Sequence, residues 1–118
     1  MADAYARISG LGCAIATSGP GFTNLITPIA VSFADSIPCL YIVGNTATFR
    51  LDTYGTRQVG FQYTPTVEIA KAITKYAVTV TKKEMILPEL AKCLRIAKEG
   101  RQGPVLFDIP DDLQRADV

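Results

Sequence analysis

The chain has 118 residues, of which 48% are hydrophobic and 19% charged, and its formal net charge is +1. This composition predicts one globular domain with a real core and excludes a disordered chain. The balanced charge argues against nucleic acid as a partner, and no apolar run approaches the roughly 20 residues that a membrane span needs. Because Asp3 and Arg7 stand where a signal peptide would be apolar, we expect a cytoplasmic protein.

Cysteine and histidine usage narrows the possible chemistry. Cys13, Cys39 and Cys93 fall in apolar contexts, at spacings typical of neither a zinc site nor a disulfide framework, so we predict reduced thiols in the core. The chain has no histidine, which excludes Ser-His and Cys-His nucleophile pairs.

Four short, mostly apolar runs predict strands that are covered on both faces, as in a parallel sheet. They comprise residues 13–17, 39–43, 77–81 and 105–109. Helical patterns lie between several of these runs. We therefore predict an α/β domain with a doubly wound parallel sheet in three layers.

Two helices are indicated by apolar residues at helical spacing. The first has its apolar stripe at Phe22, Leu25, Ile26, Ile29 and Phe33. Pro28 lies inside this pattern and lacks the N–H that would bond the carbonyl of Asn24, so we expect a bend at a cost of ~3 kcal/mol. The second covers residues 85–99, with Pro88 in its first turns and Gly100 as its stop. Its buried face is predicted to comprise Ile86, Leu90, Cys93, Leu94 and Ala97.

The turn between the first strand and the first helix is rich in glycine, with residues 17–24 reading TSGPGFTN. Such a turn lets a ligand approach the backbone and presents free N–H groups at the positive end of a helix, although it also occurs as a plain tight turn. A long polar segment, residues 44–66, follows the second strand. It begins at the carboxyl end of that strand, and the carboxyl ends of the strands are where open α/β sheets carry their ligand sites.

Five segments taken together resemble one known family. They are residues 2–7 (ADAYAR), 17–24 (TSGPGFTN), 60–62 (GFQ), 73–76 (ITKY) and 100–110 (GRQGPVLFDIP). Their order and spacing are similar to those of the pyrimidine-binding (PYR) domain of thiamine diphosphate enzymes of the acetolactate synthase type. The resemblance implies that residues 1–118 are a partial PYR domain, truncated at its N-terminus, with about four of the usual six strands and no second domain.

The resemblance also implies a cofactor site. The residues at the aminopyrimidine end of thiamine diphosphate would be Gly19, Pro20, Gly21 and Asn24, and those of the substrate pocket Phe61 and Gln62. Structural alternatives stay open: the glycines could serve the turn alone, Asn24 could cap a helix, and Phe61 could pack in the core. Gln62 has no evident structural role.

The family's proton-placing glutamate precedes the ADAYAR segment, and a Gly-Asp-Gly segment on another domain binds Mg²⁺ and the diphosphate. Neither is present in these 118 residues, so we predict no catalytic residue, no metal-binding residue and no cofactor bound by this chain alone. The acids Asp108, Asp111 and Asp112 fit the exit from the last strand better than a metal site. The parent enzyme would condense or decarboxylate 2-keto acids of the pyruvate class, whereas the isolated chain would be inactive.

A shortened sheet would have an uncovered edge, so we expect self-association into a homo-oligomer. One alternative is a stand-alone PYR subunit that pairs with a separately encoded diphosphate-binding chain. Another is a Rossmann nucleotide binder, because Gly19-x-Gly21 follows a strand and opens a helix. Against it, Asn24 occupies the third glycine position, and the second strand ends without a ribose-binding acid.

Overall fold

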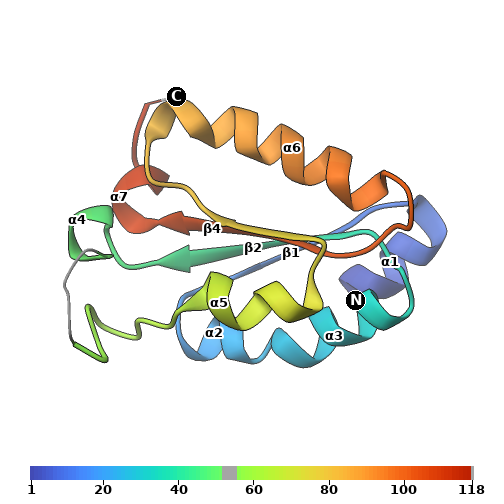
Figure 1. Ribbon diagram of the computed structural model, residues 1–118, viewed down its shortest axis with the longest axis horizontal. Coiled ribbons are helices and arrows are strands. Elements are labelled where there is room, and N and C mark those ends of the chain that lie inside the picture. Colours follow the sequence, from blue (N-terminus) through green and yellow to red (C-terminus); the bar gives the residue numbers. More distant parts are fainter. Residues whose placement is uncertain (52–55, 118) are drawn as a thin grey trace.

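The computed structural model describes residues 1–51 and 56–117. Its centre is a four-stranded parallel sheet in the order β1-β2-β4-β3 (Figure 1). The strands are β1 (Gly12–Ala16), β2 (Cys39–Asn45), β3 (Tyr76–Thr79) and β4 (Val105–Pro110). The predicted parallel sheet is confirmed, and each strand lies within two residues of its expected bounds.

Helices cover both faces of this sheet (Figure 1). One face carries α1 (Ala2–Ser9), α2 (Pro20–Thr23), α3 (Ile26–Ala34), α5 (Thr66–Ala70) and the 3-10 turn η1 (Lys71–Ile73). The opposite face carries α6 (Ile86–Lys98), which follows the 3-10 turn η2 (Lys83–Met85). Two short helices, α4 (Thr48–Leu51) and α7 (Asp111–Gln114), lie at the carboxyl ends of the strands. This is the predicted doubly wound, three-layer arrangement.

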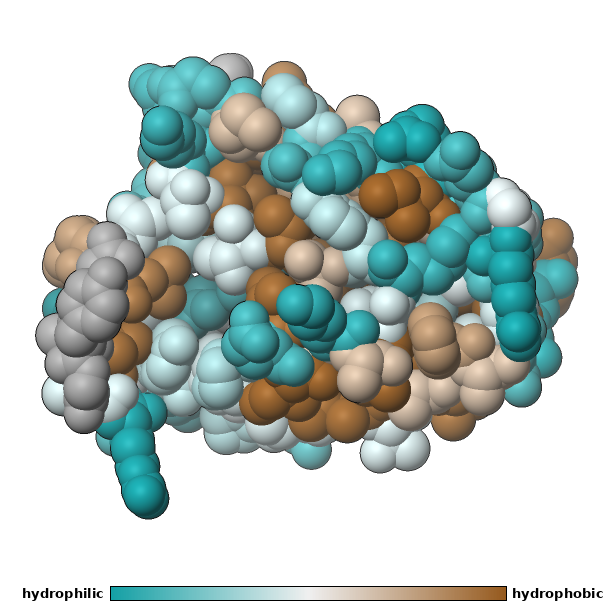
Figure 2. Space-filling view, in the orientation of Figure 1, coloured by the Kyte–Doolittle hydropathy of each residue, from teal (hydrophilic) through white to brown (hydrophobic). Residues whose placement is uncertain are grey.

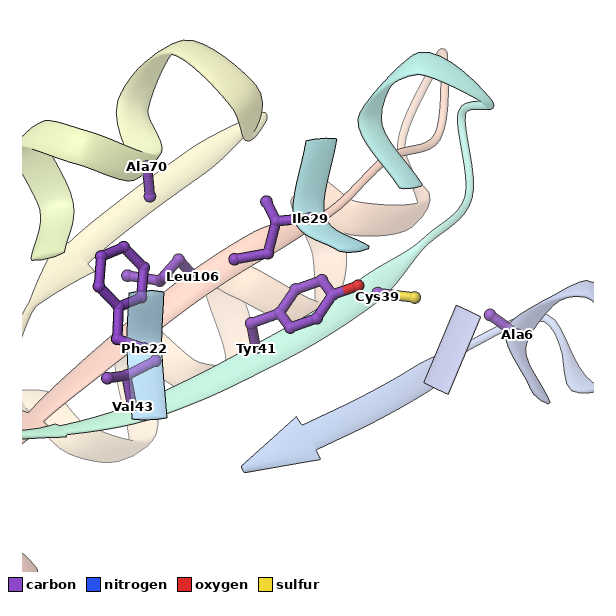
Figure 3. Close-up of a cluster of buried hydrophobic side chains, with 8 residues drawn as sticks. All are labelled: Ala6, Phe22, Ile29, Cys39, Tyr41, Val43, Ala70 and Leu106. Carbon is purple, nitrogen blue, oxygen red and sulfur yellow. The ribbon is translucent and has the colours of Figure 1, made fainter. Parts of the chain in front are cut away.

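Each side of the sheet has its own hydrophobic core. Figure 3 shows the cluster beneath α2, α3 and α5, where Phe22, Ile29, Tyr41 and Leu106 are almost completely buried. The second cluster packs against α6 and includes Phe107. Successive strand residues alternate between the two clusters because side chains of a strand point to opposite faces. Burial of each large apolar side chain stabilises the fold by ~1.5–3 kcal/mol.

The first crossover helix is split in two. α2 ends at Thr23 and α3 begins at Ile26, so Pro28 lies in the first turn of α3, where proline is tolerated. In place of the expected bend, the helix is broken between Thr23 and Ile26. The break includes Asn24, whose carbonyl cannot accept a hydrogen bond from Pro28. Phe33 is a correction: it is 41% exposed, because α3 turns this side chain away from the core that the rest of the stripe contacts.

The prediction of buried thiols holds for two of the three cysteines. Cys39 and Cys93 are completely buried, and burial raises the pKa of Cys93 to about 11. Cys13 is exposed, so the prediction is wrong there. The reason is its place on β1, which is the edge strand of the sheet.

The predicted second helix is confirmed as α6, with Ile86, Cys93 and Ala97 buried. It ends before Gly100, whose φ of 58° takes the chain into the left-handed region. In Figure 2 hydrophilic surface dominates near α6, whereas hydrophobic surface gathers over α2 and α3. Within the described ranges, no helix has both the length and the apolar character to cross a membrane.

The predicted long segment, residues 44–66, is only partly a loop. It contains the end of β2, the short helix α4 and the first residue of α5. Residues 52–55 of this segment lie outside the described residues.

Candidate functional site

The glycine turn, residues 17–21, follows β1 directly. Gly19 is buried and adopts φ 58° and ψ −117°, a conformation that favours glycine because it has no Cβ. The Gly19 carbonyl accepts a hydrogen bond from Thr23 N (2.9 Å), and Pro20 occupies the first position of α2. The predicted sequence of strand, glycine turn and helix is confirmed.

A second turn, residues 60–63, packs against the glycine turn. A Cβ added at Gly19 would lie 2.7 Å from the Gln62 carbonyl oxygen. Gln62 itself has a positive φ of 54°, and Tyr63 N donates to Gly60 O (3.2 Å) to close the turn. The structure therefore brings Gly19 and Gln62 together, a contact that local sequence patterns could not show.

An open cleft of about 970 Å³ lies beside these turns, at the carboxyl ends of β1, β2 and β4. Its lining includes Thr17, Ser18 and Phe61 together with residues of α4 and α7. Its position is the usual one for ligands in open α/β sheets, and its size is that of a cofactor site. Phe61 is 81% exposed, which excludes the alternative that it packs in the core.

The other predicted site residues lie outside the lining of this cleft. Pro20 and Asn24 are exposed, and Gly21 is half-buried against the Thr17 side chain. Asn24 ends α2, where its backbone N–H donates to Pro20 O (3.1 Å), so it caps the end of this helix rather than its start. Of the six predicted residues, only Phe61 is therefore part of the cleft wall.

Asp108 is a buried carboxylate that the sequence analysis did not select. It lies inside β4, not at the strand's exit, and is completely buried. Its Oδ2 accepts hydrogen bonds from Asn45 Nδ2 (2.7 Å) and Thr79 Oγ1 (2.8 Å), whereas Oδ1 has no partner among the residues that the structure describes. Burial raises the pKa of Asp108 to about 6, against the opposing effect of these two hydrogen bonds. An acid within an otherwise apolar strand was the sequence signal that could have identified it.

The two neighbouring acids take different partners. Asp112 accepts hydrogen bonds from Thr48 N (3.0 Å) and Thr48 Oγ1 (2.5 Å), and Asp111 forms an ion pair with Arg115 (2.8 Å). Over the described residues, no group of three or more His, Cys, Asp or Glu side chains is placed to share a metal ion. These acids therefore support α4 and α7 at the rim of the cleft.

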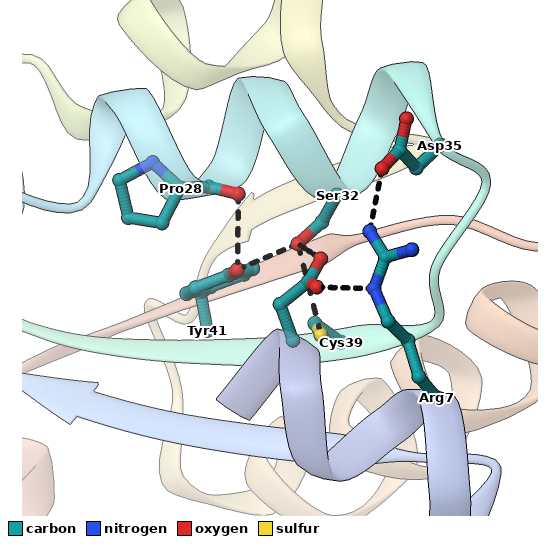
Figure 4. A network of polar contacts seen from close by, with 7 residues as sticks. Arg7, Pro28, Ser32, Asp35, Cys39 and Tyr41 are labelled. Carbon is teal, nitrogen blue, oxygen red and sulfur yellow. Dashed lines mark hydrogen bonds and ion pairs between the residues drawn. The ribbon is translucent and has the colours of Figure 1, made fainter. Parts of the chain in front are cut away.

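The ADAYAR segment forms part of α1 and has a structural role. Figure 4 shows the polar network that joins α1, α3 and β2. Arg7 contacts both Asp3 (2.7 Å) and Asp35 (2.5 Å), and Ser32 Oγ donates to Asp3 Oδ2 (2.8 Å). The hydrogen bond from Arg7 is the main cause that lowers the pKa of Asp3. Asp3 belongs to this network and is not among the residues that line the cleft.

Known proteins resemble this chain over almost all of its length. Residues 1–69 match the family model described as thiamine pyrophosphate enzyme, N-terminal TPP binding domain. The chain is 42% identical over 115 residues (97% of its length) to acetolactate synthase 2, chloroplastic, of Zea mays. It is 40% identical over 117 residues (98%) to the mitochondrial acetolactate synthase catalytic subunit of Saccharomyces cerevisiae, and 42% identical over 118 residues (99%) to the acetolactate synthase large subunit of Corynebacterium glutamicum. It spans 17%, 16% and 18% of these relatives, respectively.

Proposed function

We propose that this chain, which belongs to the thiamine pyrophosphate enzymes, forms the pyrimidine-binding part of an acetolactate synthase-like enzyme. The chain matches the N-terminal TPP-binding domain of that family. The parent enzyme would act on 2-keto acids of the pyruvate class. The observation that carries this proposal is the 40–42% identity to acetolactate synthases over 97–99% of the chain.

The residues around the cleft fit the aminopyrimidine end of thiamine diphosphate. This ring has two apolar faces and a polar edge. The cleft offers the apolar side chains of Ile15, Ile42 and Phe61 beside the polar groups of Thr17 and Ser18. When bound, the cofactor supplies the chemistry that makes or breaks the carbon–carbon bond next to a keto group.

The part that this chain plays is to bind and orient. In the proposed site Phe61 faces the substrate from the cleft wall, with Gln62 next to it in the same turn. Gly19, Pro20, Gly21 and Asn24 lie outside the cleft lining, on the adjacent glycine turn and α2, and approach the pyrimidine from there. The contact between Gly19 and Gln62 supports this assignment, because it keeps the two groups of residues adjacent. A turn locked by packing holds its ligand at a lower entropic cost than a free loop.

We propose that a separate domain or subunit supplies Mg²⁺, the diphosphate contacts and the catalytic acid. The isolated chain is then half of a site, which has no turnover and no tight cofactor binding. The cytoplasmic location expected from the sequence stays a prediction, and microscopy of a fluorescent fusion would test it.

The first test is an NMR titration of the ¹⁵N-labelled chain with thiamine, followed by calorimetry with thiamine diphosphate and Mg²⁺. We expect weak, saturable shifts at Gly19, Gly21, Phe61 and Gln62, and no measurable heat at micromolar cofactor. Shifts that avoid these residues would contradict the assigned site. Tight binding in calorimetry would instead indicate a self-sufficient binding subunit.

Two exposed aromatic residues provide a matched pair of variants for this titration. Phe61→Ala should abolish the shifts at the glycine turn without unfolding the chain, because its side chain is 81% exposed. Tyr5→Ala removes an aromatic ring that is 65% exposed on α1, away from the cleft, and should leave the titration unchanged. Equal effects of the two substitutions would argue against a specific role for Phe61.

A further inference from the structure

Asp108 joins the carboxyl ends of three adjacent strands. It stands on β4, and its Oδ2 holds Asn45 at the end of β2 and Thr79 at the end of β3. Asn45 is itself 7% exposed, so its bond to Asp108 is shielded from water. A hydrogen bond to a buried, ionised acceptor is roughly twice as strong as one between neutral groups.

The Asn45 side chain links Asp108 to the backbone of the next residue, Thr46. While its Nδ2 donates to Asp108, its Oδ1 accepts a hydrogen bond from Thr46 N (2.8 Å). In such a chain, donation to a carboxylate makes the amide oxygen a stronger acceptor. The charge on Asp108 therefore strengthens the hydrogen bond that the Thr46 amide donates to Asn45 Oδ1.

The Thr46 side chain in turn supports the turn of residues 60–63. A Cβ added at Gly60 would overlap the Thr46 side chain, so these two residues are in close contact. On its other side, the same turn rests on the glycine turn through Gln62 and Gly19. Residues 60–63 are thus held between Thr46 and Gly19.

We propose that Asp108 is a positioning residue that, through Asn45 and Thr46, sets the place of Phe61 and Gln62 against the glycine turn. The roles of Phe61 and Gln62 toward a ligand rest on the proposed function, whereas the connection itself can be measured without any ligand.

The ionisation of Asp108 can be followed separately from that of the titratable groups near it. Tyr63 and Glu68 line the same small pocket of about 240 Å³ as Asp108. Asp112 contacts Thr48 at the start of α4. Burial tends to raise the pKa of Asp112, but hydrogen bonds, those from Thr48 first among them, outweigh this effect and lower it. Asp108 differs in having its pKa raised, to about 6, so its charge changes at a higher pH than that of Asp112.

The experiment is a pH titration of the ¹⁵N-labelled chain from pH 4.5 to 8 without ligand. We expect the amide signals of Thr46, Gly60 and Gln62 to shift together with a midpoint near pH 6, as Asp108 gains its charge. A carboxylate that only filled space would not produce a common midpoint. Glu68→Gln removes a second carboxyl among the described residues that line this pocket and should leave the midpoint in place.

Three variants separate the connection from general stability. Asp108→Asn should abolish the common midpoint and displace the Gly60 and Gln62 signals. The double variant Asn45→Asp with Asp108→Asn exchanges the two groups and should restore the signals, because the amide then on β4 can donate to the carboxylate then on β2. Thr79→Val removes the other hydrogen bond of Asp108 and should leave the Gly60 and Gln62 signals in place.

Two results would overturn the proposal. One is that Gly60 and Gln62 keep their signals in a folded Asp108→Asn variant. The other, which decides the matter even if that variant does not fold, is the lack of a common midpoint in the unmodified chain. Either outcome leaves the proposed cofactor site standing, because that site is tested by the thiamine titration alone.

Discussion

Gly19 shows how one residue can be constrained twice. Its φ of 58° is costly for a residue with a Cβ, and its hydrogens face the backbone of Gln62. Gly100 has the same φ of 58°, but a Cβ added there would meet no atom of the described residues within 4 Å. A substitution at Gly100 therefore carries only the conformational cost of a positive φ, whereas one at Gly19 carries that cost and the crowding by Gln62 as well.

We expect Gly19→Ala to reduce the free energy of unfolding by several kcal/mol and Gly100→Ala by only ~1–2 kcal/mol, the cost of a left-handed backbone alone. Urea unfolding followed by circular dichroism measures both. The larger loss at Gly19 follows from the predicted 2.7 Å approach of the new Cβ to Gln62 O. Equal losses would mean that the turn of residues 60–63 moves aside freely.

At the scale of elements, polar contacts connect helices that hydrophobic packing alone would not orient. The Tyr41 hydroxyl donates to Pro28 O (3.3 Å) and shares a hydrogen bond with Ser32 Oγ (3.0 Å). Ser32 also contacts Asp3 on α1, so one network links α1, α3 and β2 (Figure 4). Burial raises the pKa of Tyr41 to about 12, which keeps its hydroxyl protonated.

We predict that Tyr41→Phe lowers the free energy of unfolding by ~1–3 kcal/mol, because it removes the hydrogen bonds that the buried Tyr41 hydroxyl makes with Ser32 Oγ and Pro28 O. Tyr76→Phe is the control: its hydroxyl contacts Lys92 and Glu89 (2.7 Å each), which still pair with each other at 3.5 Å. Thermal or urea unfolding should rank the variants in this order. A smaller loss for Tyr41→Phe would indicate that water replaces its hydroxyl.

At the scale of the whole molecule, the sheet has an edge with apolar side chains. Among the described strands, β1 pairs only with β2. Ile15 on this strand is 77% exposed, and Cys13 is also exposed. An edge of this kind is a template for pairing with another chain, which supports the homo-oligomer that the sequence analysis expected.

We expect the chain to self-associate in sedimentation experiments and Ile15→Lys to shift it toward monomer, because a charged side chain blocks edge pairing. Leu87→Lys is the matched control, since Leu87 is 61% exposed but lies on α6 rather than on the edge strand. A monomer at high concentration would contradict self-association. Equal effects of the two lysines would point to general solubility rather than to β1.

The sequence by itself determined the fold class, the four strands, an irregularity of the first crossover helix near Pro28 and the glycine turn, whereas the split into α2 and α3 was seen only in the structure. Each depends on neighbours within a few positions: alternating or helical burial, the missing proline N–H and the freedom of glycine. The motifs in their order were also sufficient to identify the family.

Only the tertiary structure decided which residues meet. Asn45 and Asp108 are 63 positions apart, and their contact exists because β2 and β4 are neighbours in the sheet. The exposure of Cys13 likewise depends on β1 lying at the edge, and that of Phe33 on how α3 packs. Strand order and helix orientation are set by the packing of the whole chain, so local sequence patterns could not supply them.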